Sequence, residues 1–249
     1  MKKIKINFRI VNNQKIQTFR LNVMLHGLLM EIIPPSYAEL LHSLPVNPYS
    51  QSVKLEGDLY IWQINLLDED AESLIGQALL DDEFSQFNLR SLNEGLCRIE
   101  SKTTEELSQK QLTDIFYEDK TVSKIRLHFN TPTAFKQQGE YVFVPDVRLI
   151  FQSLLMKHSQ LIDHREEINV ELLEEMIQSS RISSYRLNSY YYQIHGIKIP
   201  AFMGSITLDV RAAQSLINFM LVLFKFGEYS GVGIKTSMGM GSLTLGQLR

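Results

Sequence analysis

The stretch that decides the fold is Gly231-Val-Gly-Ile-Lys-Thr-Ser-Met-Gly-Met-Gly241, which ends eight residues before the last residue, Arg249. Its glycines stand at positions 231, 233, 239 and 241, and Lys235, Thr236 and Ser237 lie between them. Glycine tolerates positive φ and lets another backbone approach closely, so such a run can turn its amide N–H groups toward an anion. The pattern predicts a loop that binds phosphate, with a purely structural hairpin as the alternative.

Two common phosphate-binding loops do not match this stretch. A Walker loop has glycine directly before Lys-Ser/Thr, where this chain has Ile234. The dinucleotide fingerprint needs a third glycine at the position of Thr236 and a helix after the loop. Only eight residues follow Gly241, which leaves no room for that helix and the rest of its domain. The loop therefore belongs to another kind of site.

Hydrophobic periodicity predicts an α+β organisation in the first half. Residues 4–11 alternate like a half-buried strand, and residues 22–33 carry the broad apolar face of a helix. The other predicted elements are a continued hairpin at 15–19, a helix at 36–44 with Ser36 as its N-cap, strands at 50–55 and 58–67, a helix at 69–80 capped by Asp68, and a strand pair within 84–102 that turns at Asn93–Gly95. This is the βαββαβ order of the ferredoxin-like fold.

The same order restarts after a polar, loosely helical linker at 104–117. The predicted elements are strands at 121–129 and 141–144, helices at 145–158 and 170–177, strands at 182–194 and 199–210, a helix at 212–226 and a last strand at 242–245. The sequence therefore predicts two tandem ferredoxin-like (βαββαβ, RRM-like) domains, residues 1–120 and 121–249. The second domain carries the glycine-rich loop near its C-terminus.

Composition favours a soluble, cytoplasmic protein. Hydrophobic residues make up 44% of the 249, enough for a substantial core, and no stretch is apolar for the length of a membrane span. The single cysteine, Cys97, cannot form an intramolecular disulfide, which fits a reducing compartment. The net charge is −3, but residues 123–249 carry 13 Lys+Arg against 10 Asp+Glu, so the half with the loop is basic, as phosphate binding requires.

Together with Leu221-Val-Leu-Phe-Lys-Phe-Gly-Glu-Tyr-Ser230, the loop closely resembles the C-terminal signature of the CRISPR-associated repeat-RNA endoribonucleases of the RAMP superfamily. That signature has two Gly-hydrophobic-Gly triplets separated by a short spacer. Phe129-Asn-Thr-Pro-Thr-Ala-Phe-Lys136 is similar to the family's TPT strand, and Ile199–Leu208, with Gly204 inside it, is similar to a later strand. In the first half, Leu25-His-Gly-Leu-Leu29 and Leu40-Leu-His42 also resemble the family.

The resemblance implies a function as well as a fold. It implies an endoribonuclease that cleaves CRISPR repeat RNA in precursor transcripts (pre-crRNA) to generate guide RNAs, without a metal or other cofactor. It also implies that the glycine-rich loop contacts the RNA backbone through Gly231, Gly233, Lys235, Thr236, Ser237, Gly239 and Gly241. Two protein partners are left open, the subunits of a CRISPR effector complex and a second copy of the chain.

Metal-free cleavage of RNA needs only proton transfer and charge stabilisation. A base takes the proton of the 2′-hydroxyl, its oxygen attacks the adjacent phosphate, and the 5′-oxygen leaves with a proton from an acid, so that a 2′,3′-cyclic phosphate remains. Imidazole can serve as base and as acid, and a cation or an amide can stabilise the phosphorane.

Two of the six histidines are candidates for this chemistry. By resemblance, His42 matches the family's most frequent catalytic histidine, late in the second helix, and a helix C-terminus favours the protonated ring that a general acid needs. His26 is the second candidate, with a structural role in its helix as the alternative. For the other four histidines, a solvated or structural role is expected instead of catalysis. They are His128, His158, His164 and His195.

The third catalytic group is open. Some relatives carry a tyrosine near the position of Met30 and a lysine shortly after the histidine, where this chain has Asn47, Pro48 and Tyr49. Lys54 or Lys235 could supply the missing charge.

The strand predicted at residues 182–194 is rich in tyrosine and arginine, and it is a second candidate for RNA contact. Aromatic faces commonly hold unpaired bases, so the tyrosines and arginines of this strand could clamp RNA, with inward packing as the alternative. At least one of three consecutive tyrosines must be exposed. The residues are Arg181, Tyr185, Arg186, Tyr190, Tyr191 and Tyr192.

Two other functions compete with cleavage. A catalytically inactive RAMP subunit that holds crRNA in an effector complex would explain the same fold and loop, and only the histidines distinguish it from the enzyme. A two-domain protein with a small-molecule or regulatory role would leave Lys235 and the basic half without a purpose.

Overall fold

The computed structural model describes residues 1–12, 15–90, 95–119, 121–194 and 196–249. The chain forms two compact units. Met1–Glu106 form the N-terminal unit together with Ser237–Gly239, and Leu107–Thr236 form the C-terminal unit together with Met240–Arg249. A domain division after residue 120 stays a prediction. Within the described residues, none of the helices has the length and apolar character needed to cross a lipid bilayer.

The N-terminal unit is built on a five-stranded antiparallel sheet in the order β2-β3-β1-β5-β4. The central strand β1 buries Ile4, Ile6 and Phe8 on one face, as the alternation of its sequence predicts. The strands are β1 (Lys2–Ile10), β2 (Tyr49–Glu56), β3 (Leu59–Leu66), β4 (Gln86–Asn88) and β5 (Leu96–Glu106). Without the short edge strand β4, this is the ferredoxin-like strand order.

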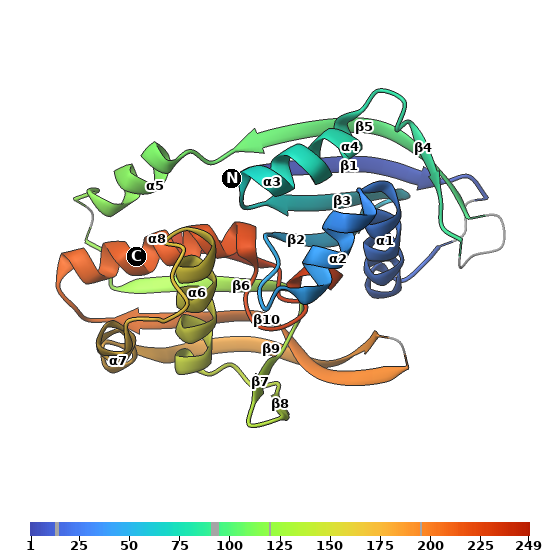
Figure 1. The fold of residues 1–249 in the computed structure, drawn as a ribbon. Coiled ribbons are helices and arrows are strands. Elements are labelled where there is room, and N and C mark those ends of the chain that lie inside the picture. Colours follow the sequence, from blue (N-terminus) through green and yellow to red (C-terminus); the bar gives the residue numbers. More distant parts are fainter. Residues whose placement is uncertain (13–14, 91–94, 120, 195) are drawn as a thin grey trace. The chain divides into compact units, whose positions relative to one another are not determined.

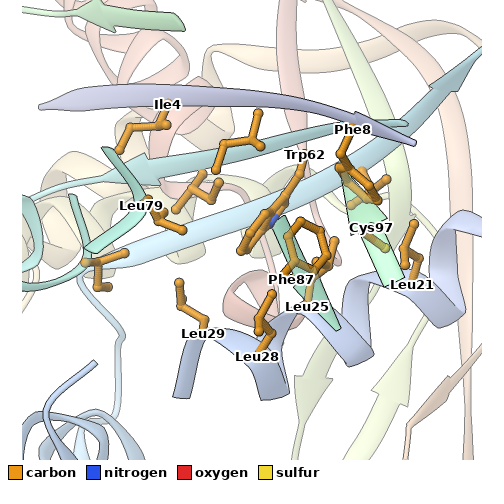
Figure 2. Close-up of a cluster of buried hydrophobic side chains, with 14 of the residues drawn as sticks. Ile4, Phe8, Leu21, Leu25, Leu28, Leu29, Trp62, Leu79, Phe87 and Cys97 are labelled. Atoms are coloured by element: carbon orange, nitrogen blue, oxygen red, sulfur yellow. The ribbon is translucent and has the colours of Figure 1, made fainter. Parts of the chain in front are cut away.

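Helices cover the apolar face of this sheet. Figure 2 shows Leu25, Leu28 and Leu29 of α1 directed toward the side of the sheet that carries Trp62 and Phe87. The side chain of Asp68 accepts a hydrogen bond from the Ala71 amide, so the predicted cap is confirmed. The helices are α1 (Thr18–Ile32), α2 (Pro35–Ser43), α3 (Glu69–Ala71) and α4 (Gln77–Leu80), with a π-helical turn at Glu72–Gly76 between the last two.

Two predictions in this half were wrong. The hairpin expected at 15–19 is absent there, because α1 already begins at Thr18 and buries Leu21 and Asn22. Ser36 is not the N-cap of α2, because the helix begins at Pro35 and Pro34 takes the cap position without a side-chain hydrogen bond. Proline suits the first helical position since its fixed φ matches the helix and its missing N–H is not needed there. The turn expected at Asn93–Gly95 falls mainly outside the described residues.

The C-terminal unit repeats the plan. Its antiparallel sheet has the order β11-β6-β10-β9, which is again ferredoxin-like, and Figure 1 shows β6, β10 and β9 running side by side. The strands are β6 (Lys124–Thr133), β9 (Ser180–Ile194), β10 (Ile197–Val210) and β11 (Leu243–Leu248), with a separate hairpin of β7 (Phe135–Gln137) and β8 (Glu140–Val142). The helices are α5 (Gln109–Phe116), α6 (Val147–Leu161), α7 (Val170–Gln178) and α8 (Gln214–Ser230).

The sheet of the C-terminal unit has one apolar and one polar face. Ile125, Leu127 and Phe129 of β6 are buried in the core with Phe151 of α6 and Phe224 of α8. The alternate residues of β6 and its neighbours therefore point away from the helices. This polar face is where Arg126, His128 and Arg186 lie.

Two elements differ from the predictions here. The stretch expected to be a linker contains the end of β5 and the helix α5, whose start is fixed by a capping box between Ser108 and Gln111. The amide of Asn218 in α8 donates to the carbonyl oxygens of Phe116 and Glu118, which anchors the end of α5. The first strand also runs on through the TPT segment to Thr133 instead of ending at Phe129.

Candidate functional site

His26 lies on α1 one turn after Asn22, at the border of the helix's buried face. Its neighbours Leu25 and Leu29 are fully buried, whereas the imidazole itself is half-buried. The ring's Nδ1 lies 2.9 Å from the hydroxyl of Tyr49, the first residue of β2. This hydrogen bond fixes the orientation of the imidazole.

Tyr49 connects His26 to the glycine-rich loop. The tyrosine is 1% exposed, and burial raises the pKa of its hydroxyl above the ordinary value, so the group stays protonated at neutral pH. Ser237 hydrogen-bonds the same hydroxyl through its side chain. A chain of hydrogen bonds therefore runs from Ser237 through Tyr49 to His26.

A second buried contact holds the backbone at Ser237. The Nε2 of Gln51 donates to the Ser237 carbonyl oxygen at 2.8 Å, and its Oε1 accepts from the indole N–H of Trp62 at 2.7 Å. Gln51 and Trp62 are both buried, so these bonds are shielded from water and have much to lose if a partner is removed. Ser237 is thus held by its side chain and by its main chain.

His42 lies in the last turn of α2 and is exposed to solvent. The ammonium group of Lys54, the first candidate for the missing cation, pairs with Glu56 at 2.6 Å. Among the residues that the structure describes, no three His, Cys, Asp or Glu side chains are close enough together to hold a metal ion. The described candidate residues of the N-terminal unit are the imidazoles of His26 and His42 and the hydroxyls of Tyr49 and Ser237.

All four glycines of the loop have positive φ, and their packing explains why. A Cβ at Gly241 would overlap the carbonyl oxygen of Val232, and one at Gly239 would overlap the side chain of Asn22. These positions need glycine because protein atoms already occupy the space that a side chain would take. The glycines therefore serve close packing of the loop itself.

The loop's amides are also largely used inside the protein. Gly241 N–H donates to Pro132 and Ile234 N–H to Ala134, while Gly233 N–H donates to the hydroxyl of Ser153. The TPT segment and the glycine-rich loop, which are far apart in sequence, thus form one hydrogen-bonded structure. The expected row of outward amides is absent for these three groups, because the strand end and α6 satisfy them.

Lys157 of α6 hydrogen-bonds the start of the glycine-rich loop. Its buried ammonium group donates to the carbonyl oxygens of Ser230 and Gly231 at 3.2 and 3.1 Å and approaches the hydroxyl of Thr236 at 3.3 Å. Burial lowers the pKa of Lys157 to about 7. Thr236 is therefore a structural partner of Lys157, and its side chain is buried with it.

Replacing Lys157 with methionine should change how stability depends on pH. The folded-state pKa lies below the unfolded value of 10.5, so the unfolded chain binds the extra proton between about pH 7 and pH 10. The parent's free energy of unfolding, measured against that of Lys157→Met, should rise across this window by up to about 1.4 kcal/mol per pH unit. Urea unfolding of both proteins at pH 7, 8 and 9 measures it. Parallel pH profiles would contradict this account of Lys157.

Only a short part of the loop is accessible. Lys235 is exposed at φ +56°, and Gly233 and Ile234 are half-buried, whereas Thr236, Ser237, Gly239 and Gly241 are buried. The loop therefore presents a single cation at its tip. Of the residues predicted to contact RNA, the buried ones shape the loop and Lys235 can reach a ligand.

The roles of Tyr49 and Lys157 were not predicted from the sequence. Lys157 had a signal, since it continues the stripe formed by Ile150 and Leu154, at the helical spacing i, i+4, i+7, where an apolar residue is expected. Tyr49 had none, because its contact with His26 joins a strand end to a helix 23 residues away.

Comparison with known proteins assigns the chain to a family. Residues 127–243 match the family model of the CRISPR-associated endoribonuclease Cas6. A CRISPR-associated endoribonuclease Cas6 of Streptococcus thermophilus is 36% identical over 246 residues, covering 98% of both chains. Its counterpart from Mycobacterium tuberculosis is 41% identical over 221 residues, covering 88% of this chain and 69% of that protein.

The fold agrees with this assignment. A Cas6 structure solved as a product complex superimposes with a TM-score of 0.79 at 18% identity, covering 99% of this chain and 100% of that one. The match confirms the prediction of tandem ferredoxin-like folds. The relative from Streptococcus thermophilus is more than one-third identical to this chain along almost the whole length of both proteins. The chain therefore belongs to the family of CRISPR-associated Cas6 endoribonucleases.

Proposed function

We propose that this protein is an endoribonuclease that cleaves CRISPR repeat RNA in precursor transcripts to generate guide crRNAs. The observation that carries the proposal is the full-length similarity to a protein named as a CRISPR-associated endoribonuclease. We assign the two proton transfers of a metal-independent cleavage to His26, whose ring is held by Tyr49, and to the exposed His42.

The reaction is transesterification within the RNA. His26 takes the proton of the 2′-hydroxyl, and the 2′-oxygen forms a bond to the adjacent phosphorus. The bond from phosphorus to the 5′-oxygen breaks, and that oxygen leaves with a proton donated by His42. The products are a 2′,3′-cyclic phosphate and a 5′-hydroxyl, with one proton taken up and one given back.

Tyr49 prepares His26 for the role of base. When Nδ1–H donates to the tyrosine oxygen, the lone pair of the neutral ring lies on Nε2, the nitrogen that can accept a proton. The side chain of Ser237 hydrogen-bonds the same Tyr49 hydroxyl. This is the role that an orienting group plays beside a catalytic histidine, so Tyr49 is a positioning residue. His42, an exposed imidazole in the last turn of α2, takes the role of the acid.

The glycine-rich loop contributes Lys235 to binding of the RNA backbone. Lys54 and Lys235 both stay candidates for the cation that stabilises the phosphorane. Lys235→Ala should lower affinity for repeat RNA and reduce the slope of log K against log salt by about one charge. Titrations at several salt concentrations, with Lys198→Ala as an exposed control, measure this. An unchanged slope would remove Lys235 from the RNA interface.

The cleavage assay itself tests the proposal. Purified protein is incubated in EDTA with the repeat RNA of its own locus, and the ends of the products are identified. Fragments ending in a 2′,3′-cyclic phosphate are expected. Tight binding without any cleavage would overturn the proposed activity and favour an RNA-holding RAMP subunit.

The cytoplasmic location and the protein partners also stay proposals. A CRISPR effector complex and a second copy of this chain are the two candidates. Sedimentation of the protein with and without repeat RNA tests the second copy, and a monomer at micromolar concentration under both conditions would exclude it.

A further inference from the structure

A pocket of about 480 Å³ lies on the polar face of the C-terminal sheet. Its walls come from β6, β10 and β9, which Figure 1 shows as neighbouring strands. The pairing register places His128 opposite Ser205 and Ser205 opposite Arg186, so these three residues form one row across the sheet. The lining residues used below are Arg126, His128, Arg186, Asn188, Tyr190 and Gly204.

Gly204 lies in the wall of the pocket, at an irregular point of β10. Its φ is +128°, and a Cβ there would overlap the carbonyl oxygen of Arg186 on the neighbouring strand. Register shifts between Phe202 and Gly204 show that β10 is irregular at this point. Glycine inside a strand often marks such a close approach of another backbone, so the packing of β10 against β9 requires glycine at this position.

The charge of the pocket is positive. Two guanidinium groups and one imidazole line it, and the described lining residues include no Asp or Glu. Arg126 donates there to a neutral partner, the hydroxyl of Ser205, at 3.4 Å. Arg181, farther along β9, differs because its guanidinium group pairs with Asp209 at 3.3 Å. The pocket arginines therefore suit an anionic ligand, and guanidinium groups match the geometry of phosphate oxygens.

The remaining walls suit a nucleobase. Tyr190 supplies a half-buried aromatic ring, and Asn188 supplies an amide that can both donate and accept hydrogen bonds. The predicted exposure of at least one tyrosine in this strand is confirmed, since Tyr185 and Tyr191 are each 74% exposed while Tyr192 is buried. Tyr190 is the tyrosine of this run that lines the pocket.

We propose that this pocket binds one nucleotide of unpaired RNA, with Arg126 and Arg186 on the phosphate, Tyr190 against the base and Asn188 at the base edge. The inference rests on the proposed function and adds to it a nucleotide-binding site within the C-terminal unit. Unpaired RNA fits better than duplex RNA because a base in a duplex is stacked and paired and cannot enter a concave pocket. Aromatic contact together with a basic lining is how proteins hold single strands.

Affinity for an uncleavable RNA tests the proposal. The probe is repeat RNA with a 2′-deoxy substitution at the cleavage site, labelled for fluorescence anisotropy. Arg186→Ala and Tyr190→Ala should each weaken binding about tenfold, whereas Tyr190→Phe keeps the ring and should bind as the parent does. Arg211→Ala is the matched control, because it makes the same change of charge at an exposed position just after β10, outside the pocket lining. It should change the affinity less than about twofold.

Competition identifies the form of RNA that occupies the pocket. A short unpaired oligoribonucleotide should displace the probe from the parent protein, and the same oligonucleotide annealed to its complement should not. Equal weakening by Arg186→Ala and Arg211→Ala, or equal competition by duplex, would overturn the proposal. If the parent protein cleaves repeat RNA while the pocket variants bind it with the parent's affinity, the proposed nucleotide site is refuted and the enzymatic function is retained. If the parent protein neither binds nor cleaves repeat RNA but binds the unpaired oligonucleotide in a way that depends on Arg186, the proposed enzymatic function is refuted and the nucleotide site is retained.

Discussion

Replacing His42 with alanine is expected to slow cleavage of repeat RNA about 100- to 10,000-fold, the range in which general acid catalysis contributes. The 5′-oxygen is a poor leaving group without a proton, so the loss falls on the chemical step. Because His42 is exposed at the end of α2, its removal leaves no buried cavity and should leave RNA affinity nearly unchanged. Single-turnover rates at saturating enzyme, measured beside the dissociation constant, separate the two effects.

His164→Asn serves as the control for this experiment. His164 is also an exposed histidine, and asparagine tolerates its positive φ of 54°. The control should cleave at the parent's rate. A His42→Ala protein that cleaves as fast as this control would remove His42 from the mechanism.

The second large effect is expected at His26. His26→Ala removes the proposed base and should lower the single-turnover rate by at least about 100-fold. Tyr49→Phe keeps the buried ring but removes the hydroxyl that holds Nδ1, so a smaller loss of about tenfold is expected. It also leaves the Ser237 hydroxyl without this partner, at a cost of about 1 kcal/mol in the free energy of unfolding.

The double variant shows whether Tyr49 acts through His26. If it does, His26→Ala with Tyr49→Phe should cleave no more slowly than His26→Ala alone, because the positioned group is already gone. Multiplied losses would mean that Tyr49 affects catalysis by another route. A fully active His26→Ala protein would instead assign His26 a structural role.

Local pattern was sufficient for most of the fold. The alternation of Ile4, Ile6 and Phe8 predicts β1, and the apolar stripe that includes Leu25 and Leu29 predicts α1, because each pattern reports one buried face. The errors came where two signals compete. Residues 15–19 alternate weakly, yet helix α1 takes Thr18 and Phe19 because the chain gains more by extending an already buried face.

The candidate site was predictable only in part. The loop could be recognised from its glycines, but their main reason is packing, and Gly239 against Asn22 joins residues more than two hundred positions apart. No local pattern carries such information. The pocket depends in the same way on the register of β6, β10 and β9, which brings Arg126 and Arg186 to one side of an irregular strand. The aromatic and basic run of β9 was visible in the sequence, whereas its partner Arg126 was not.

The most direct test of the central claim is to remove a single atom from the RNA, the 2′-oxygen next to the scissile phosphate. Two repeat RNAs are incubated with the protein in EDTA, one unmodified and one with a 2′-deoxy residue immediately 5′ of the scissile phosphate. The proposed mechanism predicts cleavage of the first and none of the second, with equal affinity for both, because only the attacking oxygen has been removed. Cleavage of the deoxy-substituted RNA at the same phosphate would contradict attack by the 2′-hydroxyl, and with it the roles proposed for His26 and His42.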